Sequence, residues 1–173
     1  KWAQEFFDVN PDEWTERQKS NLIPELPSHL NTPYHISSQS EPYFWGPTSV
    51  RLDTEGRLFI ADRDNNRIMI WDQDGNYIDQ WTQFGRPSGI SFDGNGQIFV
   101  ADSESDDIQN PGGEMGIRIG NVQTGWVTDF IIYQWGDPRE TAGNGAEFVA
   151  VDRHGNMYGG EPRPRKLQKY VRV

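Results

Sequence analysis

Residues 53–75 read DTEGRLFIADRDNNRIMIWDQDG, in which two short apolar runs are separated by aspartate, asparagine and glycine. The runs at 58–61 and 67–71 are rich in residues that favour β-strands. Before the first run, the side chain of Asp53 can accept hydrogen bonds from backbone amides ahead of it, and Gly56 can adopt a positive φ. The segment therefore predicts antiparallel strands joined by tight turns.

This pattern occurs three times along the chain. Segments that begin at residues 47, 87 and 146 align without gaps as PTSVRLDTEGRLFIAD, PSGISFDGNGQIFVAD and AEFVAVDRHGNMYGGE. Each contains Asp-x-x-Gly, and an acid follows the glycine by six residues, at Asp62, Asp102 and Glu161. Because these acids recur in every unit, we expect them to support the fold by hydrogen-bonding the turns that follow them.

One unit places four short antiparallel strands in about 40 residues, which matches one blade of a β-propeller. The sequence therefore predicts an all-β fold with about three four-stranded blades in the region 47–173, at 47–82, 84–132 and 145–173. The last unit leaves little room for a fourth strand. Residues 1–46 do not fit the repeat, and Asn10-Pro11-Asp12-Glu13 predicts a short helix that ends near residue 20. The rest of that segment is expected to be irregular or to form a degenerate blade.

The composition restricts the partners of the protein. A formal net charge of −10, from 26 acidic and 16 basic residues, opposes binding to nucleic acid and to anionic membranes. No apolar run approaches the length of about 20 residues that spans a bilayer, and there is no cysteine. The chain opens at Lys1 without a methionine or an apolar signal segment, so we expect a processed, soluble protein that is secreted or periplasmic.

With these repeats laid out, the chain resembles NHL-repeat proteins over about residues 46 to 173. The likeness is carried by PTSVRLDTEGRLFIADRDNNRIMIWDQDG, FGRPSGISFDGNGQIFVADSES, GIRIG and GAEFVAVDRHGNMYGGE. It is similar to the peptidyl-α-hydroxyglycine α-amidating lyase subgroup and, more distantly, to the gluconolactonase propellers. The resemblance implies a closed propeller of about six blades. We therefore expect a second copy or a partner chain to complete it, or the chain to be a fragment, or the first 46 residues to supply a divergent blade.

The resemblance also implies where chemistry would lie. In the lyase, the loop before each innermost strand commonly reads Pro-His-Gly, and those histidines hold zinc in the central channel. The matching positions, five residues before each Asp of Asp-x-x-Gly, are Thr48, Ser88 and Glu147. Because a catalytic zinc needs about three N, O or S ligands, two hydroxyls and one carboxylate do not predict a zinc site at these positions.

Three candidate residues follow from this comparison. Glu147 is a carboxylate at the channel mouth, where it can bind Ca²⁺, act as a general base or pair with an arginine across the channel. Arg63 stands where the other units have Ser103 and Pro162, so it is expected to bind an anionic ligand or to pair with a local acid. His35 comes one residue after the histidine position of a faint Asn-x-Pro-His motif and is a candidate metal ligand.

Two functions remain open from the sequence. The first is a non-catalytic or catalytically degenerate propeller that acts as a binding and interaction module, with a small molecule or peptide in its channel. The second is a metal-dependent lyase or lactonase-like hydrolase that uses zinc or calcium in the same channel. The absence of histidine at Thr48, Ser88 and Glu147, together with only three visible blades, favours the first.

Overall fold

The computed structural model describes residues 44–106, 109–133, 145–163 and 165–172, and within these ranges the chain consists of strands, turns and one short 3₁₀ turn. The predicted helix near residues 10–20 and His35 lie outside them. The described residues contain no helix long and apolar enough to cross a membrane. The predicted all-β propeller fold is confirmed.

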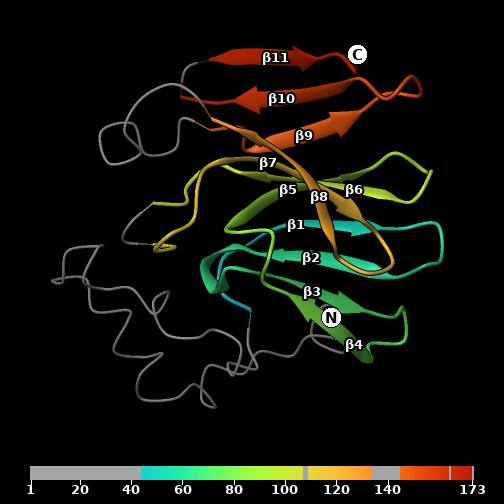
Figure 1. Ribbon diagram of the computed structural model, residues 1–173. Coiled ribbons are helices and arrows are strands. Elements are labelled where there is room, and N and C mark those ends of the chain that lie inside the picture. The colour runs from blue at the N-terminus through green and yellow to red at the C-terminus, as the bar shows by residue number, and fades with distance from the viewer. Residues whose placement is uncertain (1–43, 107–108, 134–144, 164, 173) are drawn as a thin grey trace, which may run out of the picture.

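The strands form three antiparallel sheets, each built from consecutive strands, that lie one on another (Figure 1). The first sheet contains β1 (Pro47–Leu52), β2 (Leu58–Asp62), β3 (Arg67–Trp71) and β4 (Tyr77–Trp81), with the 3₁₀ turn η4 (Arg63–Asn65) between β2 and β3. The second sheet contains β5 (Pro87–Phe92), β6 (Gln97–Asp102), β7 (Gly116–Asn121) and β8 (Val127–Ile132). The third contains β9 (Phe148–Val151), β10 (Met157–Glu161) and β11 (Lys166–Tyr170), so the last predicted blade has three strands among the described residues.

The first strands of the sheets lie side by side, with β5 between β1 and β9 (Figure 1). Gly89 in β5 makes the contact with β9 very close. A Cβ atom at Gly89 would lie 2.8 Å from the carbonyl oxygen of Glu147 and 3.1 Å from the Cα of Phe148. Only glycine leaves room for this approach, so Gly89 helps to set the position of Glu147.

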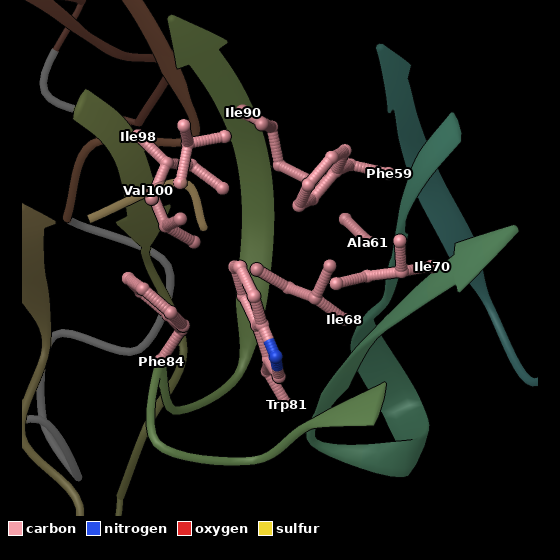
Figure 2. Close-up of a cluster of buried hydrophobic side chains, with 10 residues drawn as sticks. Phe59, Ala61, Ile68, Ile70, Trp81, Phe84, Ile90, Ile98 and Val100 are labelled. Atoms are coloured by element: carbon pink, nitrogen blue, oxygen red, sulfur yellow. The ribbon is translucent and has the colours of Figure 1, made fainter. Parts of the chain in front are cut away.

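Apolar side chains between the sheets form two cores. In each sheet, the side chains of alternate residues point toward the following sheet, which we call the front face, or toward the preceding sheet, which we call the back face. Figure 2 shows the core between the first two sheets, which joins Phe59, Ala61, Ile68 and Ile70 of one front face to Ile90, Ile98 and Val100 of the next back face. The core between the second and third sheets joins Phe99, Ala101 and Ile117 to Val149 and Met157. Full burial of each such large side chain stabilises the fold by about 1.5–3 kcal/mol.

The Asp-x-x-Gly turns have one geometry in all three sheets. The aspartate carboxylate accepts hydrogen bonds from the backbone amides two and four residues later, and the glycine has a positive φ. For Asp53, the amides are those of Glu55 at 2.9 Å and Arg57 at 2.8 Å. The turn predicted from the first sequence segment is therefore a hairpin closed by a charged acceptor.

We expect Asp152 to titrate far below an ordinary aspartate. A hydrogen bond from the side chain of Asn156, assisted by the amides of Asn156 and His154 and by the hydroxyl of Tyr158, lowers its pKa from 3.8 to about 2. Because the folded pKa is the lower one, the ionised carboxylate stabilises the fold above pH 3.8, and this stabilisation is lost as the pH falls through about 2. Carbon-13 NMR titration of the carboxyl group measures the midpoint.

The matched variant for this titration is Asn156→Ala, which removes the largest cause of the low pKa and should move the midpoint toward 3.8. A wild-type midpoint already at 3.8, or one that does not move in the variant, contradicts the expectation.

Candidate functional site

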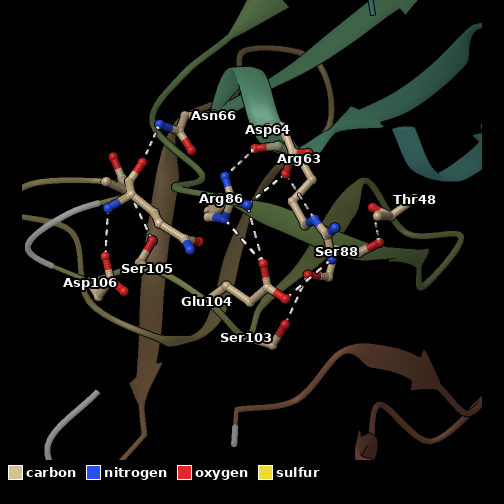
Figure 3. Close-up of polar contacts among 12 residues, drawn as sticks. Thr48, Arg63, Asp64, Asn66, Arg86, Ser88, Ser103, Glu104, Ser105 and Asp106 are labelled. Atoms are coloured by element: carbon tan, nitrogen blue, oxygen red, sulfur yellow. Dashed lines mark hydrogen bonds and ion pairs between the residues drawn. The ribbon is translucent and has the colours of Figure 1, made fainter. Parts of the chain in front are cut away.

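Polar side chains gather at one end of the stacked sheets, where β1, β5 and β9 begin and β2 and β6 end (Figure 3). The three positions singled out in the repeats, Thr48, Ser88 and Glu147, all lie at this end. We call the charged residues there the end cluster. It consists of Arg63 and Asp64 after β2, Arg86 before β5, Glu104 after β6 and Glu147 before β9.

Arg63 connects all three sheets within the end cluster. Its Nη1 lies 3.3 Å from Oε1 of Glu104 and 3.9 Å from Oε1 of Glu147, and its Nε lies 3.2 Å from Oδ1 of Asp64. The side chains of Arg63, Glu104 and Glu147 are 22%, 28% and 34% exposed. The structure therefore brings together two of the predicted site residues, Arg63 and Glu147, in a contact that solvent can reach.

Arg86 is the buried member of the cluster. Its Nη2 lies 2.6 Å from Oδ1 of Asp64 and 3.2 Å from Oε2 of Glu104, and its Nη1 donates to the carbonyl of Arg63 at 3.4 Å. Its side chain is only 3% exposed. Arg86 thus holds the loop after β2 against the loop after β6.

The hydroxyl groups at this end bind each other and the backbone. Thr48 Oγ1 donates to the carbonyl of Ser88 at 2.8 Å, and Ser88 Oγ lies 3.1 Å from Ser103 Oγ. Thr48 thereby connects β1 to β5. The positions at which the resemblance implies zinc ligands hold two engaged hydroxyls and one carboxylate paired with Arg63, and this donor set does not fit zinc.

No group of three or more histidine, cysteine, aspartate or glutamate residues suited to a metal ion occurs within 44–106, 109–133, 145–163 and 165–172. His35, the other predicted metal ligand, lies outside these ranges. The prediction for His35 therefore stays a prediction.

The recurring acids Asp62, Asp102 and Glu161 are the last residues of β2, β6 and β10, and all three are buried. Asp102 accepts hydrogen bonds from the amides of Glu104 at 3.2 Å and Ser105 at 2.9 Å, so its predicted role in the following turn is confirmed. Asp102 also accepts from the amide of Arg86 at 3.0 Å and from Nη1 of Arg118 at 3.0 Å. It therefore fixes the backbone on both sides of the end cluster.

Asp62 contacts the turn after β2 through a side chain, because Nδ2 of Asn65 donates to its Oδ2 at 2.9 Å. It accepts from the amide of Trp45 at 2.6 Å and from Nε of Arg67 at 2.7 Å, in a pair that is almost completely buried. Burial raises the pKa of Asp62 and of Asp102, while the arginines and the other hydrogen-bond donors oppose the rise. These two acids hold the backbone next to the end cluster, because they accept hydrogen bonds from the amides of Trp45 and Arg86.

Sequence reasoning did not find Asp64, Arg86 or Glu104. One signal was present for Arg86, because the other two units have Gly46 and Gly145 at the corresponding position before the first strand. An arginine that breaks a repeat at a strand end was the criterion that identified Arg63, and the same criterion identifies Arg86. Asp64 and Glu104 have no comparable signal, because Arg86, the buried partner that they share, is 22 and 18 residues away in the sequence.

The NHL repeat family matches two stretches of the chain, residues 44–71 and 84–109. They cover β1 to β3 of the first sheet, and β5 and β6 of the second with the start of the loop that follows. The first stretch includes the repeat segment that begins at residue 47, and the second includes the segment that begins at residue 87. The end-cluster residues of these two sheets also lie within the matched stretches. No curated protein sequence matches the chain significantly.

Solved structures match the chain at low sequence identity. Hydrazine synthase from Kuenenia stuttgartiensis is 14% identical, with a TM-score of 0.50, over 66% of this chain and 29% of that chain. A gluconolactonase from Xanthomonas campestris is 13% identical, with a TM-score of 0.48, over 72% and 46% of the two chains. A streptogramin B lyase is 16% identical, with a TM-score of 0.37, over 72% and 54%. The chain thus spans 29% to 54% of the length of these proteins, and the likeness concerns the fold alone.

We expect Arg86→Leu to destabilise the protein by about 3 kcal/mol, because the carboxylates of Asp64 and Glu104 lose their buried cation. Denaturant unfolding followed by fluorescence measures the change. Arg153→Leu is the matched control, because Arg153 is exposed in the β9–β10 turn, and its effect should stay within about 0.5 kcal/mol. Equal stability of Arg86→Leu and the wild type would contradict this account.

Proposed function

We propose, from the premise that this chain carries NHL repeats in a β-propeller fold, that it is a non-catalytic binding module. Its ligand is a peptide or small molecule that carries both a cationic and an anionic group, and it binds at the end cluster. The observation that carries the proposal is the contact of Arg63 with Glu104 and Glu147, which joins three sheets and remains partly exposed.

The chemistry of these side chains suits a ligand with two charges. A guanidinium presents a planar fork of N–H donors that matches a carboxylate. Glu147 lies 3.9 Å from Arg63, beyond ordinary hydrogen-bond distance, so its oxygens can accept from an ammonium group without breaking a short bond. A ligand carboxylate on Arg63 and a ligand ammonium on Glu147 would each form a charge-assisted hydrogen bond.

The same contacts support binding over catalysis. A nucleophilic hydroxyl needs an adjacent general base. Thr48 instead donates to the carbonyl of Ser88, and the hydroxyl of Ser88 lies against the hydroxyl of Ser103. Each carboxylate of the end cluster has a guanidinium within 4.0 Å, an arrangement that holds charge in place.

We expect the dipeptide glycylglycine to perturb the NMR signals of Arg63, Glu104 and Glu147 with saturation in the millimolar range, as weak two-point binding predicts. N-acetylated glycylglycine lacks the cation, glycylglycine amide lacks the anion, and each should bind at least about tenfold more weakly. Arg63→Gln, which keeps much of the side chain but not its charge, should abolish the perturbation. If the blocked and free dipeptides bind equally, or if Arg63→Gln binds as the wild type does, the end cluster is not the site.

A second candidate is a metal-dependent lyase or a lactonase-like hydrolase, and the exposure of Glu147 at a channel position favours it. On the binding proposal, purified protein should hold less than about one tenth of an equivalent of zinc or calcium, and a chelator should not change its melting temperature. Elemental analysis and thermal unfolding measure both. One equivalent of metal that is lost in Glu147→Gln would replace the binding proposal with the enzyme.

A further inference from the structure

A cavity of about 370 Å³ lies between the second and third sheets. Its apolar walls are Phe99, Ile119 and Ile131 on the front face of the second sheet and Met157 and Tyr170 on the back face of the third. Met157 begins β10, whereas the end cluster lies where the first strands of the sheets begin, so the cavity is displaced toward the opposite end of the stack. Its volume is typical of sites that bind small molecules, which measure about 300–1,000 Å³.

The chain contains a filled counterpart of this cavity. We call the core between the first and second sheets the first core and that between the second and third sheets the second core. Trp81 pairs with Ile68 across the first sheet, as Ile131 pairs with Ile117 across the second. The indole of Trp81 is 5% exposed and packs on Phe59 with ring centroids 5.4 Å apart (Figure 2). The second core therefore has an isoleucine where the first core has an indole.

The loss of aromatic volume leaves the walls of the second core less covered. Ile70 of β3 is 1% exposed, whereas its equivalent Ile119 of β7 is only half-buried and lines the cavity. A second replacement acts in the same direction. Phe92 packs on Phe59 in the first core with ring centroids 5.2 Å apart, and the equivalent residue of the third sheet is Val151. The cavity thus lies where the repeat replaces aromatic rings with aliphatic side chains.

The polar group that holds the indole is present in both cores. In the first sheet, Nε1 of Trp81 donates to Oδ2 of Asp79 at 2.9 Å. Asp129 is the equivalent aspartate of the second sheet, because the two pair with equivalent isoleucines of β3 and β7. Ile131 has no N–H group to donate, and Asp129 lines the cavity and is exposed. The cavity therefore combines apolar walls with the kind of acceptor that binds an indole in the first core.

We propose that this cavity binds a small, flat aromatic molecule that carries an N–H donor, of which indole is the simplest example. The ring lies against Phe99, as the indole of Trp81 lies against Phe59, and its N–H donates to Asp129. Burial of the ring supplies most of the affinity, and the hydrogen bond to a charged acceptor selects ligands with an N–H group. This inference does not depend on the ligand proposed for the end cluster.

The first test compares two ligands of the same shape. Indole should shift the methyl NMR signals of Ile119, Ile131 and Met157 with a Kd of about 0.1–1 mM, and it should leave those of Ile68 and Ile70 in the first core unchanged. Benzofuran has an oxygen in place of the N–H group, so it should bind about five- to tenfold more weakly. Equal affinity of the two ligands, or equal shifts in both cores, contradicts the proposal.

The second test removes the acceptor and keeps the apolar walls. In Asp129→Ala, indole and benzofuran should bind with equal affinity, because neither can form the selective hydrogen bond. Asp74→Ala is the matched control, because Asp74 is exposed in the β3–β4 turn of the first sheet, and it should keep the wild-type preference for indole. A preference for indole that persists in Asp129→Ala overturns the assignment of the acceptor.

The third test fills the cavity with an indole of the chain itself. Ile131→Trp reproduces the arrangement of Trp81, so it should raise the melting temperature by about 2–4 °C and weaken the binding of indole more than tenfold. Ile132→Trp is the matched control, because Ile132 is the next residue of β8 and its side chain points to the other face. It should bind indole as the wild type does.

Circular dichroism verifies that each variant is folded. A folded Ile131→Trp that still binds indole overturns the position of the site. If this variant does not fold, the comparison of the two ligands in wild type and Asp129→Ala decides the question alone. The dipeptide titration at the end cluster involves none of these residues, so the two proposals fail separately.

Discussion

Each of the three described sheets carries apolar side chains on both faces, and the packing of one sheet on the next buries most of them. The second sheet has a described neighbour on each side, and its core residues on both faces are almost completely buried. On the outer face of the third sheet, Leu167 and Phe148 are exposed, and on the outer face of the first sheet Val50 is exposed whereas Ile60 and Met69 are buried. The stacking of sheets therefore determines how much of the apolar core is withdrawn from water.

The same stacking creates the end cluster. Arg63, Glu104 and Glu147 come from loops of three different sheets, and no two of them are close in sequence. They meet because β1, β5 and β9 lie side by side and because Gly89 lets β9 approach β5 closely. Arg86 then neutralises Asp64 and Glu104 from the buried side. The charged surface is thus a consequence of sheet packing.

The repeat made the local structure predictable, because an Asp-x-x-Gly turn and its two strands are encoded within about 15 residues. It also placed Thr48, Ser88 and Glu147 at one end of the sheets. The contacts between sheets were not predictable in the same way. Glu104 pairs with Arg63 across 41 positions of sequence, and no local pattern specifies such a pair. The role of Thr48, which donates to the backbone of β5, likewise depends on how β1 packs on β5.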